Sequence, residues 1–317
     1  MSHPNKITIV VPFLNEKDNL PVLLERVQGV FAARTEDWEL LLVDDGSTDG
    51  SAEWVAAQAR VNSHVRLVQL TRDFGHQMAI TAGLDRSDGE AVVIMDADLQ
   101  DPPEVIPALL AKWYEGTEVV YAVRRRREGE TRMTKFLAAA FYRIFRRLAE
   151  VDIPMDAGDF RLADRCVVDA LKEMRELHRF MRGLTCWTGF RQAAVEYDRA
   201  ARLTGKTKYP VWTRLHLAFD AITSFSGAPL RWIMLLGLTV CGIAALWVVW
   251  ILWTVWFAPE NLGAPGWASL IAVIVLLSGV QLVSIGMMGQ YVSRIFEEGK
   301  RRPLYLVRAD TKDPKVD

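Results

Sequence analysis

Hydrophobic residues in the first part of the chain form short continuous runs that alternate with segments of helical spacing. The runs are rich in β-branched and aliphatic side chains, as strands buried on both faces are; they are Ile7–Val11, Leu40–Val43, Val65–Leu70, Ala91–Met95 and Val119–Ala122. The segments between them predict helices near Leu20–Ala33, Ala52–Arg60, Gln77–Leu84 and Pro103–Tyr114. Strands that alternate with helices build a mostly parallel sheet, so we expect an α/β fold.

The alternation stops after Ala122. A basic segment, Arg124–Lys135, leads into apolar helical spacing over Phe136–Leu148, and an acidic, glycine-containing turn follows at Asp156–Asp159. Further helices are predicted near Asp164–Met174 and Arg179–Thr185, and Trp212–Phe225 has the amphipathic pattern of a helix that lies in a membrane surface. Ala309–Asp317 is polar, and we expect it to be a disordered tail.

Two long apolar runs occupy the last third of the chain, Trp232–Phe257 and Trp267–Val292. Each exceeds the roughly 20 residues that cross a bilayer as a helix, so both are predicted to be transmembrane. A buried hairpin of a large soluble core is the alternative, but neither run has a polar face. The connector at 258–266 has no Lys or Arg, whereas both flanks are basic, so we expect both ends of the chain to be cytoplasmic.

These patterns divide the chain into a cytoplasmic α/β domain at 1–210, a juxtamembrane helix at 211–230, two transmembrane helices within 231–293 and a cytoplasmic tail at 294–317. No cleavable signal peptide is expected, because the first apolar stretch is short and ends at Pro12. The three cysteines and five histidines are scattered, which argues against a disulfide framework or a zinc site. The net charge of −1 says nothing about nucleic acid.

Polar residues follow the predicted strands at the point where each strand ends. Asp96, Asp98 and Gln100 come directly after Ala91–Met95 and would bring two carboxylates and an amide oxygen to one place. Such a set suits a hard divalent cation, Mg²⁺ or Mn²⁺, that also holds a diphosphate. Asp-x-Asp is also common on solvated loops, so its position after a buried strand is what makes it informative.

Two further strand ends carry candidate ligands for a nucleoside. Asp44 and Asp45 end the second strand, where a carboxylate can accept hydrogen bonds from a base or ribose; the same turn also suits capping of the next helix. The first strand leads into Pro12, Phe13, Asn15 and Glu16, which either begin a helix or form the floor under a base. At each strand end, the structural role and the nucleoside-binding role are compatible with each other.

Taken together, these motifs resemble family 2 glycosyltransferases of the GT-A fold, whose sheet is Rossmann-like and mostly parallel. The resemblance rests on Val11–Glu16, Val43–Asp49, Asp73–Gln77, Asp96–Pro103 and Gly158–Leu162. It is strongest to the branch that acts on polyprenyl phosphates, the dolichyl phosphate mannosyltransferases and the bacterial bactoprenol glucosyltransferases of the GtrB type. Tyr197–Tyr209, Ala221–Ser226 and Pro229–Arg231 look like the juxtamembrane signature of the two-helix bacterial members.

The resemblance assigns roles to individual residues. The nucleotide sugar would be held by Pro12, Phe13, Asn15, Glu16, Asp44, Asp45, Asp73 and Asp96. The metal would be bound by Asp96, Asp98 and Gln100, with Asp98 also counted as catalytic. Asp73 stands where the family is expected to have asparagine, and Thr207 replaces a usual serine. The first departure leaves the part of Asp73 in sugar choice open.

The acceptor side of the reaction is expected to be basic. Arg124, Arg125, Arg132 and Lys135 follow the fifth strand, and Arg202 and Lys208 precede the amphipathic helix, so both clusters are candidates to bind a lipid phosphate. The alternative is a solvated loop or attraction to anionic headgroups. We expect at least two of the four arginines at 124–127 to bind phosphate.

Asp159 lies where the family places a carboxylate near the sugar. It would align the acceptor, bind a sugar hydroxyl or stabilise positive charge at the anomeric carbon; an ion pair with Arg161 or Arg165 is the structural alternative. The resemblance implies a single displacement with inversion, in which a hexose moves from a nucleotide diphosphate to undecaprenyl phosphate. Glucose from UDP-glucose is the first choice, with mannose or amino-arabinose as alternatives.

Other classes fit the sequence less well. A processive polysaccharide synthase would need a Q-x-x-R-W element, which Arg182–Trp187 lacks, and more membrane helices. A non-catalytic membrane scaffold would have no reason to keep Asp96, Asp98 and Gln100 together, and a nucleic-acid binder is disfavoured by the short arginine run. We expect a multi-pass protein of the bacterial inner membrane, and a homo-oligomer such as a tetramer, from glycines such as Gly242 and Gly286.

Overall fold

The computed structural model describes residues 6–124, 157–198, 228–257 and 266–313 of the 317-residue chain. The chain divides into two compact units. The first comprises Met1–Arg147, Val151–Arg214 and Arg302–Asp317, and the second comprises Leu148–Glu150 and Leu215–Arg301. Each unit is considered by itself below.

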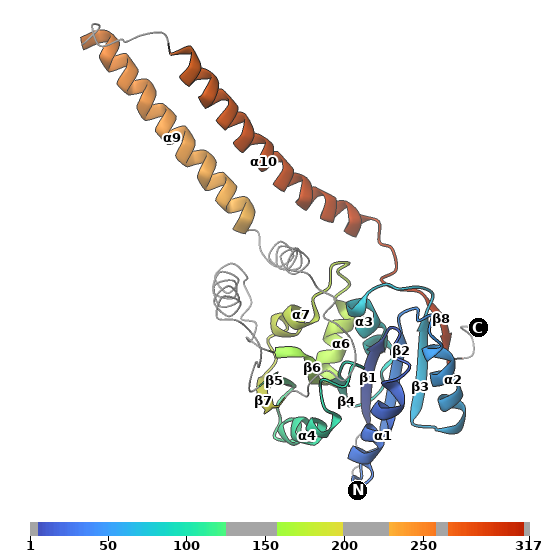
Figure 1. The fold of residues 1–317 in the computed structure, drawn as a ribbon. Helices are drawn as coiled ribbons and strands as arrows, with labels where there is room; N and C mark the ends of the chain where they lie inside the picture. The colour runs from blue at the N-terminus through green and yellow to red at the C-terminus, as the bar shows by residue number, and fades with distance from the viewer. Residues whose placement is uncertain (1–5, 125–156, 199–227, 258–265, 314–317) are drawn as a thin grey trace. The chain divides into compact units, whose positions relative to one another are not determined.

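Within the described residues, the first unit is built on one eight-stranded sheet with the order β7-β5-β6-β4-β1-β2-β3-β8 (Figure 1). The strands are β1 (Ile7–Phe13), β2 (Trp38–Asp44), β3 (Val65–Leu70), β4 (Ala91–Ile94), β5 (Val119–Arg124), β6 (Ala157–Asp164), β7 (Gln192–Tyr197) and β8 (Val307–Asp310). The central strands β4, β1, β2 and β3 are mutually parallel. β6 runs antiparallel between β4 and β5, β7 is parallel to β5, and β8 is antiparallel to β3.

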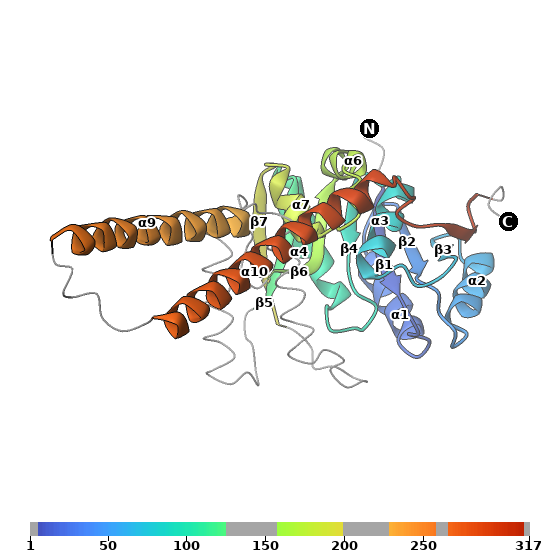
Figure 2. The same cartoon turned by 90° about the horizontal axis from the view of Figure 1, so that it is seen from above.

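Helices cover both faces of this sheet. They are α1 (Leu20–Phe31), α2 (Ser51–Val61), α3 (His76–Arg86), the 3-10 turn η1 (Pro103–Val105), α4 (Ile106–Tyr114), α6 (Arg165–Glu173) and α7 (Met181–Trp187). Figure 2 shows α1 and α6 on opposite sides of the sheet. On the α1 side, Ile9 and Val11 pack with Leu23 of α1 and Leu109 of α4 in one buried cluster.

On the other face, α3 lies very close to the sheet. A Cβ added at Gly83 of α3 would overlap the side chain of Val10 in β1 and would press against Val43 of β2. Glycine at this position therefore lets the helix backbone approach β1 and β2 closely. The close packing fixes α3, whose first residue is His76, against the two strands that lead into the candidate site.

The sequence predicted β1 to β5 and α1 to α4, together with α6 and α7, to within a few residues. The mostly parallel α/β fold is confirmed. The turn predicted at Asp156–Asp159 is wrong, because Ala157 to Asp159 are the first residues of β6. The disordered tail is wrong for Ala309 and Asp310, which belong to β8.

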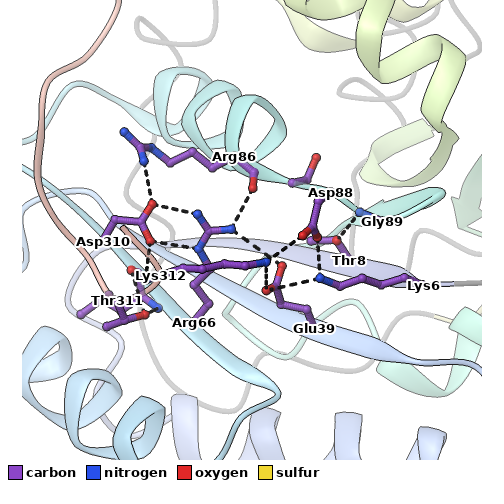
Figure 3. Close-up of polar contacts among 12 residues, drawn as sticks. Lys6, Thr8, Glu39, Arg66, Arg86, Asp88, Gly89, Asp310, Thr311 and Lys312 are labelled. Carbon is purple, nitrogen blue, oxygen red and sulfur yellow. Dashed lines mark hydrogen bonds and ion pairs between the residues drawn. The ribbon is translucent and has the colours of Figure 1, made fainter. Parts of the chain in front are cut away.

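β8 is held to the domain by a network of ion pairs (Figure 3). The buried carboxylate of Asp310 accepts hydrogen bonds from Arg66 Nε and Nη2 at 2.9 and 2.8 Å and from Arg86 Nη1 at 2.6 Å. Lys312 Nζ lies 3.3 Å from Glu39 Oε1 and 2.7 Å from Asp88 Oδ2. The segment Arg302–Asp317 is thus part of the first unit, in contrast to the disordered tail expected at Ala309–Asp317.

The described residues of the second unit form two helices, α9 (Ala228–Phe257) and α10 (Trp267–Gly299), which contain the two apolar runs. Among the residues that the structure describes, no helix has the combination of length and apolarity needed to cross a membrane. The two transmembrane helices are therefore not confirmed. The amphipathic helix predicted at Trp212–Phe225 lies outside the described residues.

Candidate active site

The candidate site lies at the carboxyl ends of β1, β2 and β4. These strands are parallel, so their ends meet at one edge of the sheet, where open α/β folds bind ligands. Phe13 and Asp44 end β1 and β2 in matched register, and Asp96 follows β4 closely. Phe13 itself is 3% exposed and belongs to the core, so it supports the site from beneath.

The loop after β1 is hydrogen-bonded to the turn after β2. Asn15 adopts a positive φ of 57°; its N–H donates to Ser47 Oγ at 2.9 Å, and its Oδ1 accepts from the Thr48 N–H at 2.8 Å. Glu16 N–H donates to Ser51 Oγ at 3.2 Å. These contacts join Asn15 and Glu16, two of the residues predicted to hold a nucleoside, to the turn after β2 and form one hydrogen-bonded floor.

Asp44 shapes this floor from inside. Its side chain is fully buried; Oδ1 accepts from the Ser47 N–H at 2.9 Å and Oδ2 from Gln69 Nε2 at 3.1 Å. Both carboxylate oxygens are thus engaged by the chain itself. The predicted contact of Asp44 with a nucleotide stays a prediction.

Asp45 holds the loop that precedes α3. Its two oxygens accept from the N–H groups of Phe74 and Gly75 at 2.8 and 3.0 Å, and the Gly75 N–H is shared with Asp73 Oδ1 at 2.9 Å. Burial, with the nearby negative charge of Asp73, raises the pKa of Asp45 to about 6. Asp45 therefore connects the end of β2 to the residues that lead to His76.

Gly46 makes this connection sterically feasible. Its φ is +86°, and a Cβ there would come within 2.7 Å of the Arg72 carbonyl carbon and the Asp73 nitrogen. The Cβ of any other residue would collide with backbone atoms, which cannot move aside by a change of rotamer. Such a residue would therefore push the two loops apart.

Asp96 and Asp98 follow β4, which is continued by a hydrogen bond from the Met95 N–H to the Val10 carbonyl at 3.1 Å. The Asp96 Oδ1 atom is buried and has no hydrogen-bond partner. Burial raises the pKa of Asp96 to about 6, against the opposing charge of His76. Asp98 Oδ1 accepts from the Gln100 N–H at 3.1 Å, so Asp98 and Gln100 are held in one tight turn.

Within the described part of the chain, no group of three or more His, Cys, Asp or Glu side chains forms a ready-made metal site. Asp96, Asp98 and Gln100 nevertheless fit a hard divalent cation, since all three offer oxygen ligands that Mg²⁺ and Mn²⁺ accept. A buried carboxylate oxygen that accepts no hydrogen bond is costly. Among the ion pairs of the described residues, Asp96 Oδ1 has only the His76 Nε2 contact at 3.4 Å, and a cation at Asp96 would satisfy it. The remaining coordination positions would fall to a diphosphate and water.

Asp159, from β6, lies on the other side of His76 from Asp96. His76 Nε2 lies 3.4 Å from Asp96 Oδ1 and 3.5 Å from Asp159 Oδ2. Arg182 of α7 donates from Nε and Nη2 to the two oxygens of Asp159 at 2.8 and 3.2 Å. Although burial alone would raise the pKa of Asp159, His76 and Arg182 hold it well below its usual range.

His76 and Arg182 were not predicted to be site residues, although both lie in segments named above for other reasons, Asp73–Gln77 and Arg182–Trp187. The ion pair considered for Asp159 with Arg161 or Arg165 is wrong. Arg161 instead donates to the carbonyl oxygens of Gly158 and Asp159, and Arg165 donates to the carbonyl of Gly89. His76 also has a raised pKa: burial lowers it, but Asp159 and Asp96 outweigh that effect.

The sequence pattern of the family described as Glycosyl transferase family 2 matches residues 8–171, a span that contains all of these carboxylates. The chain belongs to glycosyl transferase family 2. It is 44% identical to an uncharacterized glycosyltransferase of Bacillus subtilis (strain 168), over 97% of this chain and 95% of that protein. It is 38% identical to a prophage bactoprenol glucosyl transferase homolog of Escherichia coli (strain K12), with 96% and 98% covered, and to a bactoprenol glucosyl transferase of Shigella phage SfV, with the same coverage.

As a family 2 glycosyltransferase, the protein is an enzyme that transfers a sugar. Of the residues predicted to bind an acceptor phosphate, only Arg124 has a described backbone, as the last residue of β5. The others, Arg125, Arg132, Lys135, Arg202 and Lys208, lie outside the described residues. Their role in binding an acceptor phosphate stays a prediction.

Proposed function

We propose that this glycosyltransferase transfers a hexose from a nucleotide diphosphate sugar to the phosphate of a polyprenyl lipid, with UDP-glucose as the first candidate donor. Two relatives that match nearly the whole chain at 38% identity are named for bactoprenol glucosyl transfer. The observation that carries the proposal is the meeting of Asp96, His76 and Asp159 at the end of β4. This arrangement offers a place for a leaving diphosphate beside a carboxylate that faces the sugar.

The donor side follows from the chemistry of the oxygen ligands. Asp96, Asp98 and Gln100 would hold Mg²⁺ or Mn²⁺, which neutralises the negative charge that develops on the leaving diphosphate. Asp45 holds Phe74 and Gly75 in place beside the floor made by Asn15 and Ser47. We assign the nucleoside to this floor, because it is the hydrogen-bonded surface beside the carboxylates.

The acceptor needs no strong general base. A phosphate monoester already carries negative charge near neutral pH, unlike a sugar hydroxyl that must lose a proton as it attacks. Asp159, whose pKa is held low by His76 and Arg182, stays ionised and is a poor proton acceptor. It is suited instead to accept a hydrogen bond from the sugar or to face positive charge at the anomeric carbon in a single inverting displacement.

A lipid acceptor requires the enzyme to work at a membrane surface. We therefore retain as part of the proposal a multi-pass protein of the bacterial inner membrane with its catalytic domain in the cytoplasm, assembled as a homo-oligomer. The proposal is supported by the two apolar runs and by the basic residues that flank them. Arg124, Arg125, Arg132, Lys135, Arg202 and Lys208 are the proposed ligands of the lipid phosphate.

The test is a transfer assay with defined lipids. Purified full-length protein is incubated with Mg²⁺, undecaprenyl phosphate and a panel of radiolabelled nucleotide sugars, and the lipid is then extracted. We expect label in the lipid with UDP-glucose and none with undecaprenol, which lacks the phosphate. Label that appears only with GDP-mannose or an amino-arabinose donor would replace glucose by that sugar in the proposal. Lipid that stays unlabelled with every donor would refute the proposal.

A further inference from the structure

Three elements that are far apart in the sequence meet at the Asp159 carboxylate. β6 supplies Asp159, α7 supplies Arg182, and α3 supplies His76. α7 is also joined directly to the start of α3, because the Met181 N–H donates to Gln77 Oε1 at 2.9 Å. Arg182 and His76 thus approach Asp159 from two helices that are linked to each other.

The contact between Arg182 and Asp159 fixes direction as well as charge. The guanidinium uses Nε and Nη2 on separate oxygens of Asp159, at 2.8 and 3.2 Å, so the plane of the carboxylate is set by the plane of the guanidinium. The guanidinium carbon lies 5.9 Å from the centre of the Phe180 ring. A lysine ammonium at this position would keep the charge but would not set the plane.

The backbone of Asp159 is fixed separately. Arg161 donates to the carbonyl oxygens of Asp159 and Gly158 at 3.4 and 3.0 Å. β6 pairs with both β4 and β5 from Arg161 to Ala163, just after Asp159. Arg182 engages both oxygens of the Asp159 carboxylate, whereas His76 Nε2 lies 3.5 Å from Oδ2, so Arg182 holds Oδ2 on the side of His76 and Asp96.

We propose that Arg182 is a positioning residue for sugar transfer, which orients the Asp159 carboxylate toward the reacting sugar. This inference rests on the proposed function, since it assigns the sugar to the Asp159 side of the site. The side chain of Arg182 is 32% exposed and that of Asp159 9%, so the pair lies at the edge of the site. A pair with a purely structural role would not need to face His76 and Asp96, as this pair does.

The test compares Arg182→Ala, Arg182→Lys and a matched control, Arg175→Ala. Arg175 also pairs with a carboxylate of this unit, Asp85, at 2.7 Å, but it contacts the last turn of α3, away from the carboxylate cluster. We expect Arg182→Ala to lower kcat about 100-fold, as misplacement of a reacting group does, with the KM for donor changed little. Arg182→Lys is expected to lie between wild type and Arg182→Ala, and Arg175→Ala to match wild type.

Chemical rescue distinguishes positioning from stability. Guanidinium ion, added below concentrations that unfold the protein, should restore part of the kcat of Arg182→Ala, whereas methylammonium should restore less. Wild-type kcat in Arg182→Lys, or equal rescue of Arg182→Ala by both ions, would overturn the inference. If Arg182→Ala does not fold, Arg182→Lys decides alone. Wild-type protein that glycosylates another acceptor would count against the proposed function, and the same variants would then be compared on that acceptor.

Discussion

The carboxylate of Asp310, close to the C-terminus, is held in a bidentate ion pair by Arg66 of β3, with contacts of 2.9 and 2.8 Å across 244 residues of sequence. The Asp310 side chain is fully buried and that of Arg66 is 10% exposed. Tyr305 adds a hydrogen bond to Asp85 of α3 at 2.7 Å, and the Thr71 N–H donates to the Leu306 carbonyl at 3.0 Å. The segment after α10 therefore contacts both β3 and α3, the two elements that flank the loop held by Asp45.

Removing the Asp310 carboxylate should destabilise the first unit. Asp310→Ala removes both short carboxylate contacts of the buried Arg66 guanidinium and leaves it only Glu39 Oε2 at 3.9 Å and the Arg86 carbonyl at 2.9 Å. Breaking a buried pair in this way costs about 3–5 kcal/mol and should lower Tm by several degrees. Lys112→Ala is the matched control, because its pair with Glu115 on α4 is about half exposed on both sides and such pairs contribute under about 1 kcal/mol. Thermal unfolding of the full chain measures both; equal Tm values for the two variants would contradict the assignment.

Gly46→Ala should impair donor binding and lower Tm. The new Cβ would meet the backbone of Arg72 and Asp73, and the φ of +86° is unfavourable for alanine, so the loop held by Asp45 must shift. Gly29→Ala, inside α1 with open space around it, is the control and should gain up to about 1 kcal/mol. Calorimetric titration with a nucleotide sugar and thermal unfolding give the two readouts. Wild-type donor affinity in Gly46→Ala would argue against a role for this loop.

Metal affinity should fall as pH falls through about 6. Because the pKa of Asp96 is raised to about 6, protons compete with the cation for this carboxylate below that pH, and the affinity should drop up to about tenfold per pH unit. Above pH 7 the carboxylate is ionised and the affinity should level off. Mn²⁺ binding followed by electron paramagnetic resonance between pH 5 and 8 provides the measurement. An Mn²⁺ affinity that does not change across this pH range would show that Asp96 is not a metal ligand.

Substitution by asparagine should affect activity at the two aspartates after β4 and stability at Asp44. Asp98→Asn and Asp96→Asn remove a charged ligand and should reduce the rate of transfer by about 100-fold or more without a large change in Tm. Asp44→Asn affects a fully buried side chain that accepts from Ser47 and Gln69, so it should lower Tm. Full activity in Asp98→Asn would refute the metal assignment.

The central strands could be predicted from the sequence because their burial on both faces gives continuous aliphatic runs. The sequence did not predict β6, β7 and β8. Asp159 and Arg161 interrupt the pattern of β6, and the charge of Asp159 is balanced by Arg182, which only folding brings near. Asp310 in β8 is likewise balanced by Arg66, so a short charged segment resembles a polar tail until its distant partner is known.

The candidate site was predictable where it depends on strand ends. Asp45, Asp96 and Asp98 follow parallel strands, and the rule that such ends share an edge was enough to group them. His76 and Arg182 were missed because each comes from a helix whose orientation toward Asp159 is set by packing. Gly83 shows the same limit, since its close contact with Val10 has no local signature.

The central claim is transfer of a hexose to polyprenyl phosphate with inversion. The most direct test is to incubate the full-length enzyme with UDP-glucose, Mg²⁺ and undecaprenyl phosphate, to purify the lipid product, and to determine its mass and anomeric configuration by mass spectrometry and NMR. We predict undecaprenyl phosphate that carries one hexose in the β configuration, inverted from the α-linked donor. A lipid without hexose, or with hexose in the retained α configuration, would contradict this account.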